Sequence, residues 1–185
     1  ESSAFGYGDI LPDPDGIFDL PNGFSYKIIS RRGDSMSDGL VVPGQPDGMA
    51  TFPGPNRTTI VMRNHEIAPN VWGAFGEKGD LIANVDRRFL YDADEDKTAC
   101  TGGVTTIVYD TQRQEVIREF LSLGGTIRNC AGGPTPWNTW ITCEECDDRA
   151  GHYETTNVTI GKDHGYNFEV PASAEIGLAD PVPLI

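Results

Sequence analysis

Residues 103–123 read GVTTIVYDTQRQEVIREFLSL, two runs rich in β-branched and aromatic residues that are separated by the four polar residues TQRQ. Such runs are typical of β-strands, and a short polar connection between two of them is typical of a β-hairpin. Glycine and proline, 22 and 13 of the 185 residues, punctuate further runs of the same kind. These runs lie at residues 24–30, 58–64, 138–145 and 165–172. Because no stretch shows a convincing helical period, the sequence predicts an all-β fold.

The spacing of these runs indicates the kind of all-β fold. Short strands at regular intervals favour a sandwich, a barrel or a propeller over a βαβ fold. A short apolar strand, a polar turn and a return strand recur along the chain as they do in propeller blades, although residue identities show no fixed-period repeat. We therefore expect residues 1–185 to form a single region that is part of a β-propeller.

Composition limits the partners of this protein. The chain is long enough for one domain with a core, and 38% of its residues are hydrophobic. The 28 Asp and Glu residues exceed the 14 Lys and Arg residues, which gives a net charge of −14 without any basic stripe. Nucleic acids and anionic membranes are therefore poor partners, and hard cations are better ones. No apolar run approaches the roughly 20 residues of a transmembrane helix.

The run at residues 58–66, TTIVMRNHE, ends in four consecutive polar residues. Side chains alternate between the two faces of a strand, so Asn64 and Glu66 share one face, and Arg63 and His65 share the other. An amide and a carboxylate two residues apart form a pair of oxygen ligands suited to calcium. The alternative is an ordinary polar strand end, in which His65 bonds a turn carbonyl.

A second polar group follows in residues 128–145, RNCAGGPTPWNTWITCEE. Cys130 precedes a Gly-Gly-Pro turn that allows close backbone approach, so a thiolate there can be presented to a soft or borderline metal. The alternative is a buried free thiol.

Two adjacent carboxylates close the same segment. Strand alternation puts Glu144 on the face of Trp140 and Thr142, and it puts Glu145 on the opposite face. Only one of the two glutamates can therefore point into a given site, unless the strand bends.

The sequence resembles the PhoX family of secreted alkaline phosphatases. The resemblance covers nearly the whole chain and lies in four blocks: GYGDILPDPDGIFDLPNGFSYKIIS (6–30), SDGLVVPGQPDGMATFPGPNRTTIVMRNHE (37–66), GGTIRNCAGGPTPWNTWITCEE (124–145) and HGYNFEVPASAEIGLADPVPL (164–184).

This resemblance implies a β-propeller that hydrolyses phosphate monoesters with iron and calcium. It also implies secretion to the periplasm or the cell exterior, usually of the folded protein by the twin-arginine route. The metal ligands of the family are carboxylates, an Asn and one Cys. Transferred to this sequence, they imply Asn64 and Glu66 as calcium ligands, Cys130 as the iron thiolate, and Glu144 or Glu145 as a carboxylate ligand. No catalytic residue is assigned.

The family's propellers are considerably longer than this chain, which begins at Glu1 and stops within the fourth block. We therefore expect residues 1–185 to be the N-terminal portion of a propeller domain that continues beyond residue 185. Such a portion should be inactive alone, and its unpaired strand edges should promote association.

The reaction that the resemblance implies is metal-assisted phosphoryl transfer on small phosphate esters. Arg63 and Arg128 are candidates to hold the phosphate through bidentate hydrogen bonds, with a structural salt bridge as the alternative role. The alternative function is a non-catalytic secreted propeller segment used for binding or assembly. The intact NHE (64–66) and NCAGG (129–133) motifs favour the enzyme, because buried polar groups need partners.

Three other patterns are weaker. Asp92, Asp94 and Asp96 begin like a calcium loop, but Lys97 stands where such a loop needs glycine, so a solvated acidic loop is expected. His152 and His164 are expected to be ordinary surface residues. Cys100 and Cys146 are candidates for a disulfide if the compartment is oxidising.

Overall fold

The prediction of an all-β fold is confirmed by a computed structural model that describes residues 6–93, 100–155 and 157–184. In these residues the strands form antiparallel sheets, and no sheet closes into a barrel. The helical elements of the described residues are three short 3₁₀ turns: η1 (Pro55–Arg57), η2 (Asp80–Asn84) and η3 (Arg87–Phe89). No helix in the described parts of the chain is long and apolar enough to cross a membrane.

The first large sheet consists of four consecutive strands in the order β3-β4-β5-β6. The predicted hairpin forms its second half, and the four residues TQRQ connect the paired residues Asp110 and Glu115. Its strands are β3 (Pro46–Pro53), β4 (Thr58–His65), β5 (Gly102–Asp110) and β6 (Glu115–Thr126).

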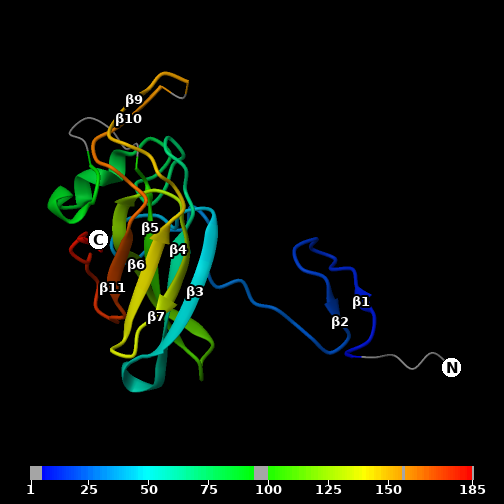
Figure 1. The fold of residues 1–185 in the computed structure, drawn as a ribbon. Coiled ribbons are helices and arrows are strands. Elements are labelled where there is room, and N and C mark those ends of the chain that lie inside the picture. The colour runs from blue at the N-terminus through cyan, green and yellow to red at the C-terminus, as the bar shows by residue number, and fades with distance from the viewer. Residues whose placement is uncertain (1–5, 94–99, 156, 185) are drawn as a thin grey trace.

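The second large sheet follows in the sequence and has the order β12-β11-β8-β7. It contains β7 (Asn129–Pro134), β8 (Thr139–Glu144), β11 (Asn167–Pro171) and β12 (Pro183–Leu184). A separate two-stranded hairpin, β9 (Gly151–Tyr153) with β10 (Val158–Ile160), lies between β8 and β11 in the chain. In Figure 1 this hairpin projects from one end of the two sheets.

The main hydrophobic core lies between the two large sheets. Strand alternation explains its composition, because alternate residues of β4 and β8 turn toward the same interior, including Ile60, Met62 and Trp140. The other buried members of this cluster are Phe52, Tyr91, Val104, Leu123, Phe168 and Val170. A second cluster contains Leu121 of β6 and side chains from residues 36–42, 74–82 and Leu90.

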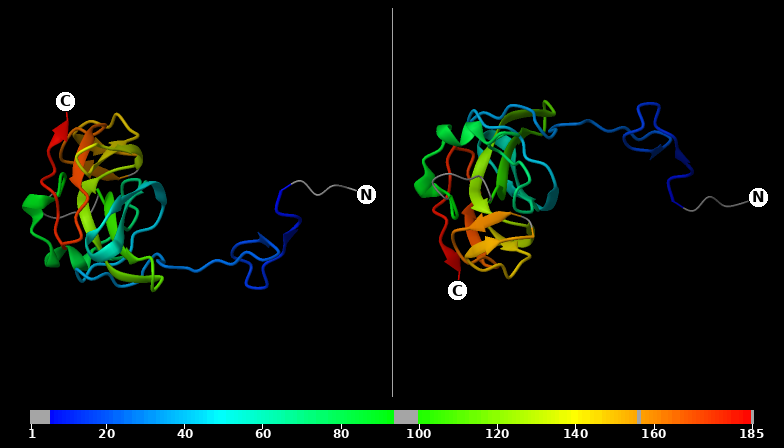
Figure 2. Two further views of the ribbon diagram at one scale, coloured as in Figure 1. Left: turned by 90° about the horizontal axis from the view of Figure 1, so that it is seen from below. Right: turned by 90° about the horizontal axis from the view of Figure 1, so that it is seen from above.

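The predicted strand at residues 24–30 is wrong, because the structure assigns no strand there. These residues belong to an extended segment that joins the small hairpin of β1 (Ile10–Leu11) and β2 (Leu20–Pro21) to the sheets. Figures 1 and 2 show that this hairpin stands apart from the rest of the molecule. A strand-like sequence without a neighbouring strand has no partner for its backbone hydrogen bonds, so it forms no sheet.

Asn64, near the end of β4, joins the two large sheets through its side chain. Its amide nitrogen donates hydrogen bonds to the backbone carbonyls of Cys130 and Ala131, each at 2.9 Å. Its amide oxygen accepts hydrogen bonds from Trp140 Nε1 and Thr142 Oγ1, each at 2.8 Å. Asn64 is fully buried, so one side chain holds β4 against both β7 and β8 with four buried hydrogen bonds.

We predict that Asn64→Ala in the complete protein lowers the free energy of unfolding by at least about 4 kcal/mol. Four hydrogen bonds are lost at about 1 kcal/mol each, and buried donors and acceptors are left without a partner. The measurement is urea denaturation, with a chelator and again with calcium.

The control is Asn167→Ala, because Asn167 is an exposed residue of β11. This change should alter the free energy of unfolding by no more than about 0.5 kcal/mol. A destabilisation by Asn64→Ala that is seen only when calcium is present would contradict this structural role.

Candidate functional site

The polar end of β4 separates into two faces, as the alternation of strand side chains predicts. Arg63 and His65 share one face, where Arg63 Nε donates to His65 Nε2 at 3.3 Å. Arg63 also forms a buried salt bridge with Glu119, with Nη2 2.6 Å from Oε1. Burial lowers the pKa of Arg63, and the charge of Glu119 opposes this shift. The structure therefore gives Arg63 the salt bridge that was its alternative role.

His65 is buried and neutral. Its Nδ1 donates to the backbone carbonyl of Gly44 at 2.7 Å, which is the turn contact considered as the alternative for this residue. Burial, together with the neighbouring charge of Arg63, lowers the pKa of His65 to about 3.

The predicted residues Glu66 and Glu145 come together with Asp47, a residue that the sequence did not single out. We call Asp47, Glu66 and Glu145 the surface carboxylate cluster. Desolvation, a hydrogen bond that protonated Glu66 donates to Asp47, and the negative charges of Asp47 and Glu145 raise the pKa of Glu66, whereas the positive charge of Arg128 lowers it. Two carboxylates and one arginine from separate segments therefore act on Glu66.

Backbone hydrogen bonds hold these segments side by side. The Glu66 amide donates to the Gln45 carbonyl at 2.9 Å, and the Arg128 amide donates to the Ile67 carbonyl at 3.0 Å. The Glu145 amide donates to the Arg128 carbonyl at 2.9 Å. Because the main chain fixes all of these segments, the carboxylates do not depend on side-chain contacts alone for their position.

Two irregular strand segments meet next to this cluster. The register of β3 shifts between Pro46 and Met49, and the register of β7 shifts between Asn129 and Gly132. A Cβ atom on Gly48, in the first segment, would lie 2.5 Å from the carbonyl oxygen of Cys130 in the second. Bulges of this kind are frequent beside active sites, where they redirect side chains. Here they bring the backbone of Cys130 next to β3, the strand that carries Asp47.

Cys130 is half-buried, with Sγ 3.8 Å from the carbonyl oxygen of Cys143. The surface carboxylate cluster and the Cys130 thiol lie in neighbouring segments, but their ligand atoms do not meet the distance expected for a single metal ion. Among the described residues, three acidic, Cys or His side chains whose ligand atoms all lie within 4.8 Å of one another occur at Asp92, Cys100 and His164 instead.

The two adjacent glutamates point into different environments, as predicted. Glu144 is buried, and its Oε1 accepts from His164 Nδ1 at 2.7 Å and from the Ile127 amide at 2.9 Å. Its Oε2 accepts from the amides of Gly165 and Tyr166 at 2.8 and 3.2 Å. Glu145 is exposed and belongs to the surface carboxylate cluster.

Two other expectations are wrong. His164 is 2% exposed and is not a surface residue, and Asp92 is 6% exposed and does not belong to a solvated loop. Asp94 and Asp96 lie outside the described residues. Cys100 and Cys146, the candidate disulfide pair, belong to one small hydrophobic cluster and both carry free thiols.

The comparisons with known proteins agree with the sequence resemblance. A family model described as alkaline phosphatase PhoX matches residues 5–185, which is essentially the whole chain. Neither the curated proteins nor the solved structures contain a significant match. Because a family model covers almost every residue, the resemblance seen in the four sequence blocks is confirmed, and the chain belongs to the PhoX alkaline phosphatase family.

Proposed function

We propose that the complete protein hydrolyses small phosphate monoesters, and that the surface carboxylate cluster and Arg128 are part of its active site. The observation that carries this proposal is that backbone hydrogen bonds hold the segments of Glu66, Glu145 and Arg128 side by side, where Asp47, Glu145 and Arg128 act on Glu66. Like-charged carboxylates at close range oppose each other's ionisation, so a bound multivalent cation is their natural counter-charge.

The donors of this region fit calcium and iron. Carboxylate oxygens are the ligands that calcium prefers, and Glu66 and Glu145 supply them with Asp47 as a further donor. The Cys130 thiol offers a ligand for iron, whose binding by cysteine thiolates is well established. Asn64 and Glu144, the other two predicted ligands, each use their oxygens for hydrogen bonds inside the protein. When bound, the cations supply charge neutralisation of the phosphate and activation of an attacking oxygen.

The residues of the chain itself have positioning roles in this proposal. Arg128 is exposed, so its guanidinium is available to an incoming phosphate and can hold two of its oxygens. Its φ angle of +50° is a left-handed conformation that is uncommon for a residue other than glycine. Strained backbone of this kind is often found at functional sites. Arg63, with its guanidinium committed to Glu119, has a structural role in linking β4 to β6.

We also propose that the two four-stranded antiparallel sheets are blades of a β-propeller. A blade is a four-stranded antiparallel sheet, and the chain order β3-β4-β5-β6 fits one. We further propose that the protein is exported to the periplasm or the cell exterior by the twin-arginine route. Membership of the PhoX family supports this location.

We predict that Glu66→Ala and Glu145→Ala in the complete protein each lower phosphatase activity at least about tenfold, because each removes a carboxylate from the proposed cation site. Excess calcium should restore part of this activity. His65→Ala should keep most of the activity and lose stability, because His65 lies on the other face of β4. The measurement is phosphate release from a chromogenic monoester across a calcium titration.

The matched control is Glu115→Gln, an exposed glutamate on β6, which should behave as the unmodified protein. If both glutamate variants keep full activity and His65→Ala is inactive, the proposed site is wrong and the functional residues lie on the His65 face of β4. A folded protein that binds metal but releases no phosphate from any monoester would support the alternative function in binding or assembly.

We predict that the iron-loaded protein absorbs visible light through sulfur-to-iron charge transfer and that Cys130→Ser removes this absorption. Cys143→Ser is the control, because Cys143 is a neighbouring half-buried cysteine to which we assign no ligand role. The measurement is the absorption spectrum together with the iron content. A folded, iron-containing Cys130→Ser protein with an unchanged spectrum would show that another residue is the ligand.

A further inference from the structure

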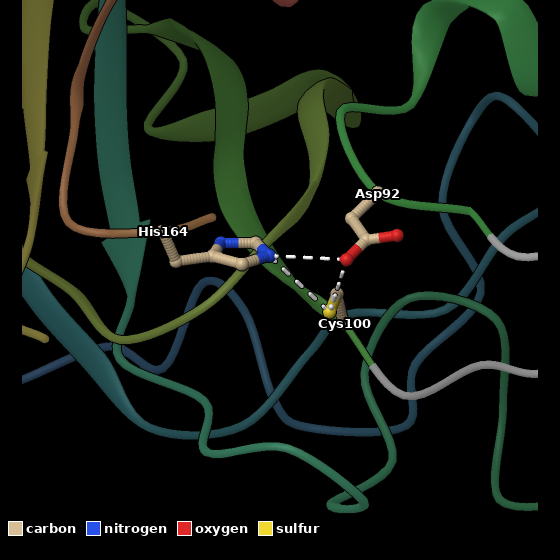
Figure 3. A group of neighbouring side chains, drawn as sticks. All are labelled: Asp92, Cys100 and His164. Atoms are coloured by element: carbon tan, nitrogen blue, oxygen red, sulfur yellow. Dashed lines mark hydrogen bonds and ion pairs between the residues drawn. The ribbon is translucent and has the colours of Figure 1, made fainter. Parts of the chain in front are cut away.

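A second group of potential metal ligands lies inside the protein, separate from the surface carboxylate cluster. Asp92, Cys100 and His164 are all buried and come from three segments: the residues that follow η3, the residues that precede β5, and the connection between β10 and β11. Figure 3 shows that the carboxylate, the sulfur and a ring nitrogen point toward one another. Neither the proposed phosphatase site nor its ligands involve these three side chains.

The three ligand atoms form a compact triangle. His164 Nε2 lies 3.2 Å from Asp92 Oδ2 and 3.6 Å from Cys100 Sγ, and Cys100 Sγ lies 3.6 Å from Asp92 Oδ2. Typical zinc–ligand bond lengths at tetrahedral angles put a nitrogen and an oxygen about 3.3 Å apart, and a sulfur about 3.6 Å from either. The observed separations therefore match three corners of one tetrahedral coordination sphere.

The surroundings of His164 also resemble those of a metal ligand. Its Nδ1 donates to the buried carboxylate of Glu144 at 2.7 Å, which turns Nε2 toward the other two ligand atoms. A carboxylate that accepts from the second ring nitrogen is the usual partner of a metal-binding histidine. Backbone amides of Gly161 and Lys162 hold Asp92 Oδ2 at 2.8 and 3.1 Å, so two of the three ligands are fixed in position.

We propose that Asp92, Cys100 and His164 bind one zinc-class divalent cation, and that Glu144 positions His164. Binding releases the thiol proton of Cys100 and any proton on His164 Nε2 to solvent. One divalent cation then balances the charges of Asp92 and the Cys100 thiolate. The burial of all three ligands indicates a structural role, in which the ion joins three separate segments of the chain.

The metal-free alternative is a buried ion triad, with an imidazolium at His164 between Asp92 and Glu144. His164 Nε2 lies 3.2 Å from Asp92 Oδ2 and its Nδ1 lies 2.7 Å from Glu144 Oε1, so the triad accounts for three of the side chains. In this triad the Cys100 thiol donates a hydrogen bond to Asp92 Oδ2 at 3.6 Å. The two states therefore differ in whether the sulfur keeps its proton or binds a cation, and a metal probe distinguishes them.

Cobalt is the probe that tests this proposal, because thiolate coordination to Co²⁺ produces a charge-transfer band. The experiment uses the complete protein carrying Cys130→Ser, so that the proposed iron thiolate cannot contribute, after removal of its metals by chelation. We expect one equivalent of Co²⁺ to produce the band, and zinc, but not calcium, to abolish it. The additional changes Cys100→Ser and His164→Gln should each remove the band, and Cys143→Ser should retain it.

The cobalt band is measured without any phosphate ester. The test of the metal site therefore stands even if the complete protein is not a phosphatase. A folded Cys130→Ser protein without the band would overturn the metal site, and so would a band that survives Cys100→Ser. If the additional variants do not fold, the midpoint of thermal unfolding of the chelated Cys130→Ser protein decides. Zinc should raise it by several degrees, and no change would overturn the proposal.

A disulfide between Cys100 and Cys146 would also exclude the site, because it removes the sulfur ligand. Alkylation of the denatured, unreduced protein followed by mass spectrometry distinguishes the two states. We expect both cysteines to be alkylated, and an unmodified pair linked to each other would overturn the proposal.

Discussion

The contact on which the arrangement of this protein most depends is the buried amide of Asn64. It bonds two carbonyls of β7 on one side and the side chains of Trp140 and Thr142 of β8 on the other. Hydrophobic packing brings two sheets together without fixing their alignment, because it is not directional. Four directional hydrogen bonds at one point fix it. The segment after β4, which carries Glu66, is thereby set beside the bulge that carries Cys130.

Charge explains why the polar residues of the chain separate into different environments. Buried charges need partners, so Arg63 pairs with Glu119, and Glu144 accepts hydrogen bonds from His164 Nδ1 and three backbone amides. Near the surface, negative charges outnumber the neighbouring positive charge. Asp47 and Glu145 raise the pKa of Glu66, and Arg128 alone lowers it by its charge. In a protein with a net charge of −14, this excess of negative charge favours multivalent cations as partners.

Local patterns predicted the strands that pair with their neighbours in sequence and failed where pairing was absent or distant. The hairpin of residues 103–123 was recognisable because both strands and the turn lie in one stretch. The run at 24–30 is also rich in apolar and aromatic residues, but it pairs with no strand in the described part of the chain. By contrast, β3, with a proline at each end and an internal glycine, is a strand because it pairs with β4. Composition describes what a segment can form, and pairing decides what it does form.

The sequence by itself determined the all-β class, the family, and the division of Glu144 from Glu145, since these follow from composition, long motifs and the two-residue period of a strand. Only the tertiary structure showed that Asp47 joins Glu66 and Glu145, and that Asp92, Cys100 and His164 converge inside the protein. These groups combine residues from separate segments of the chain, and the distances between them depend on strand register, bulges and sheet packing. Such long-range geometry leaves no local pattern in the residues that it brings together.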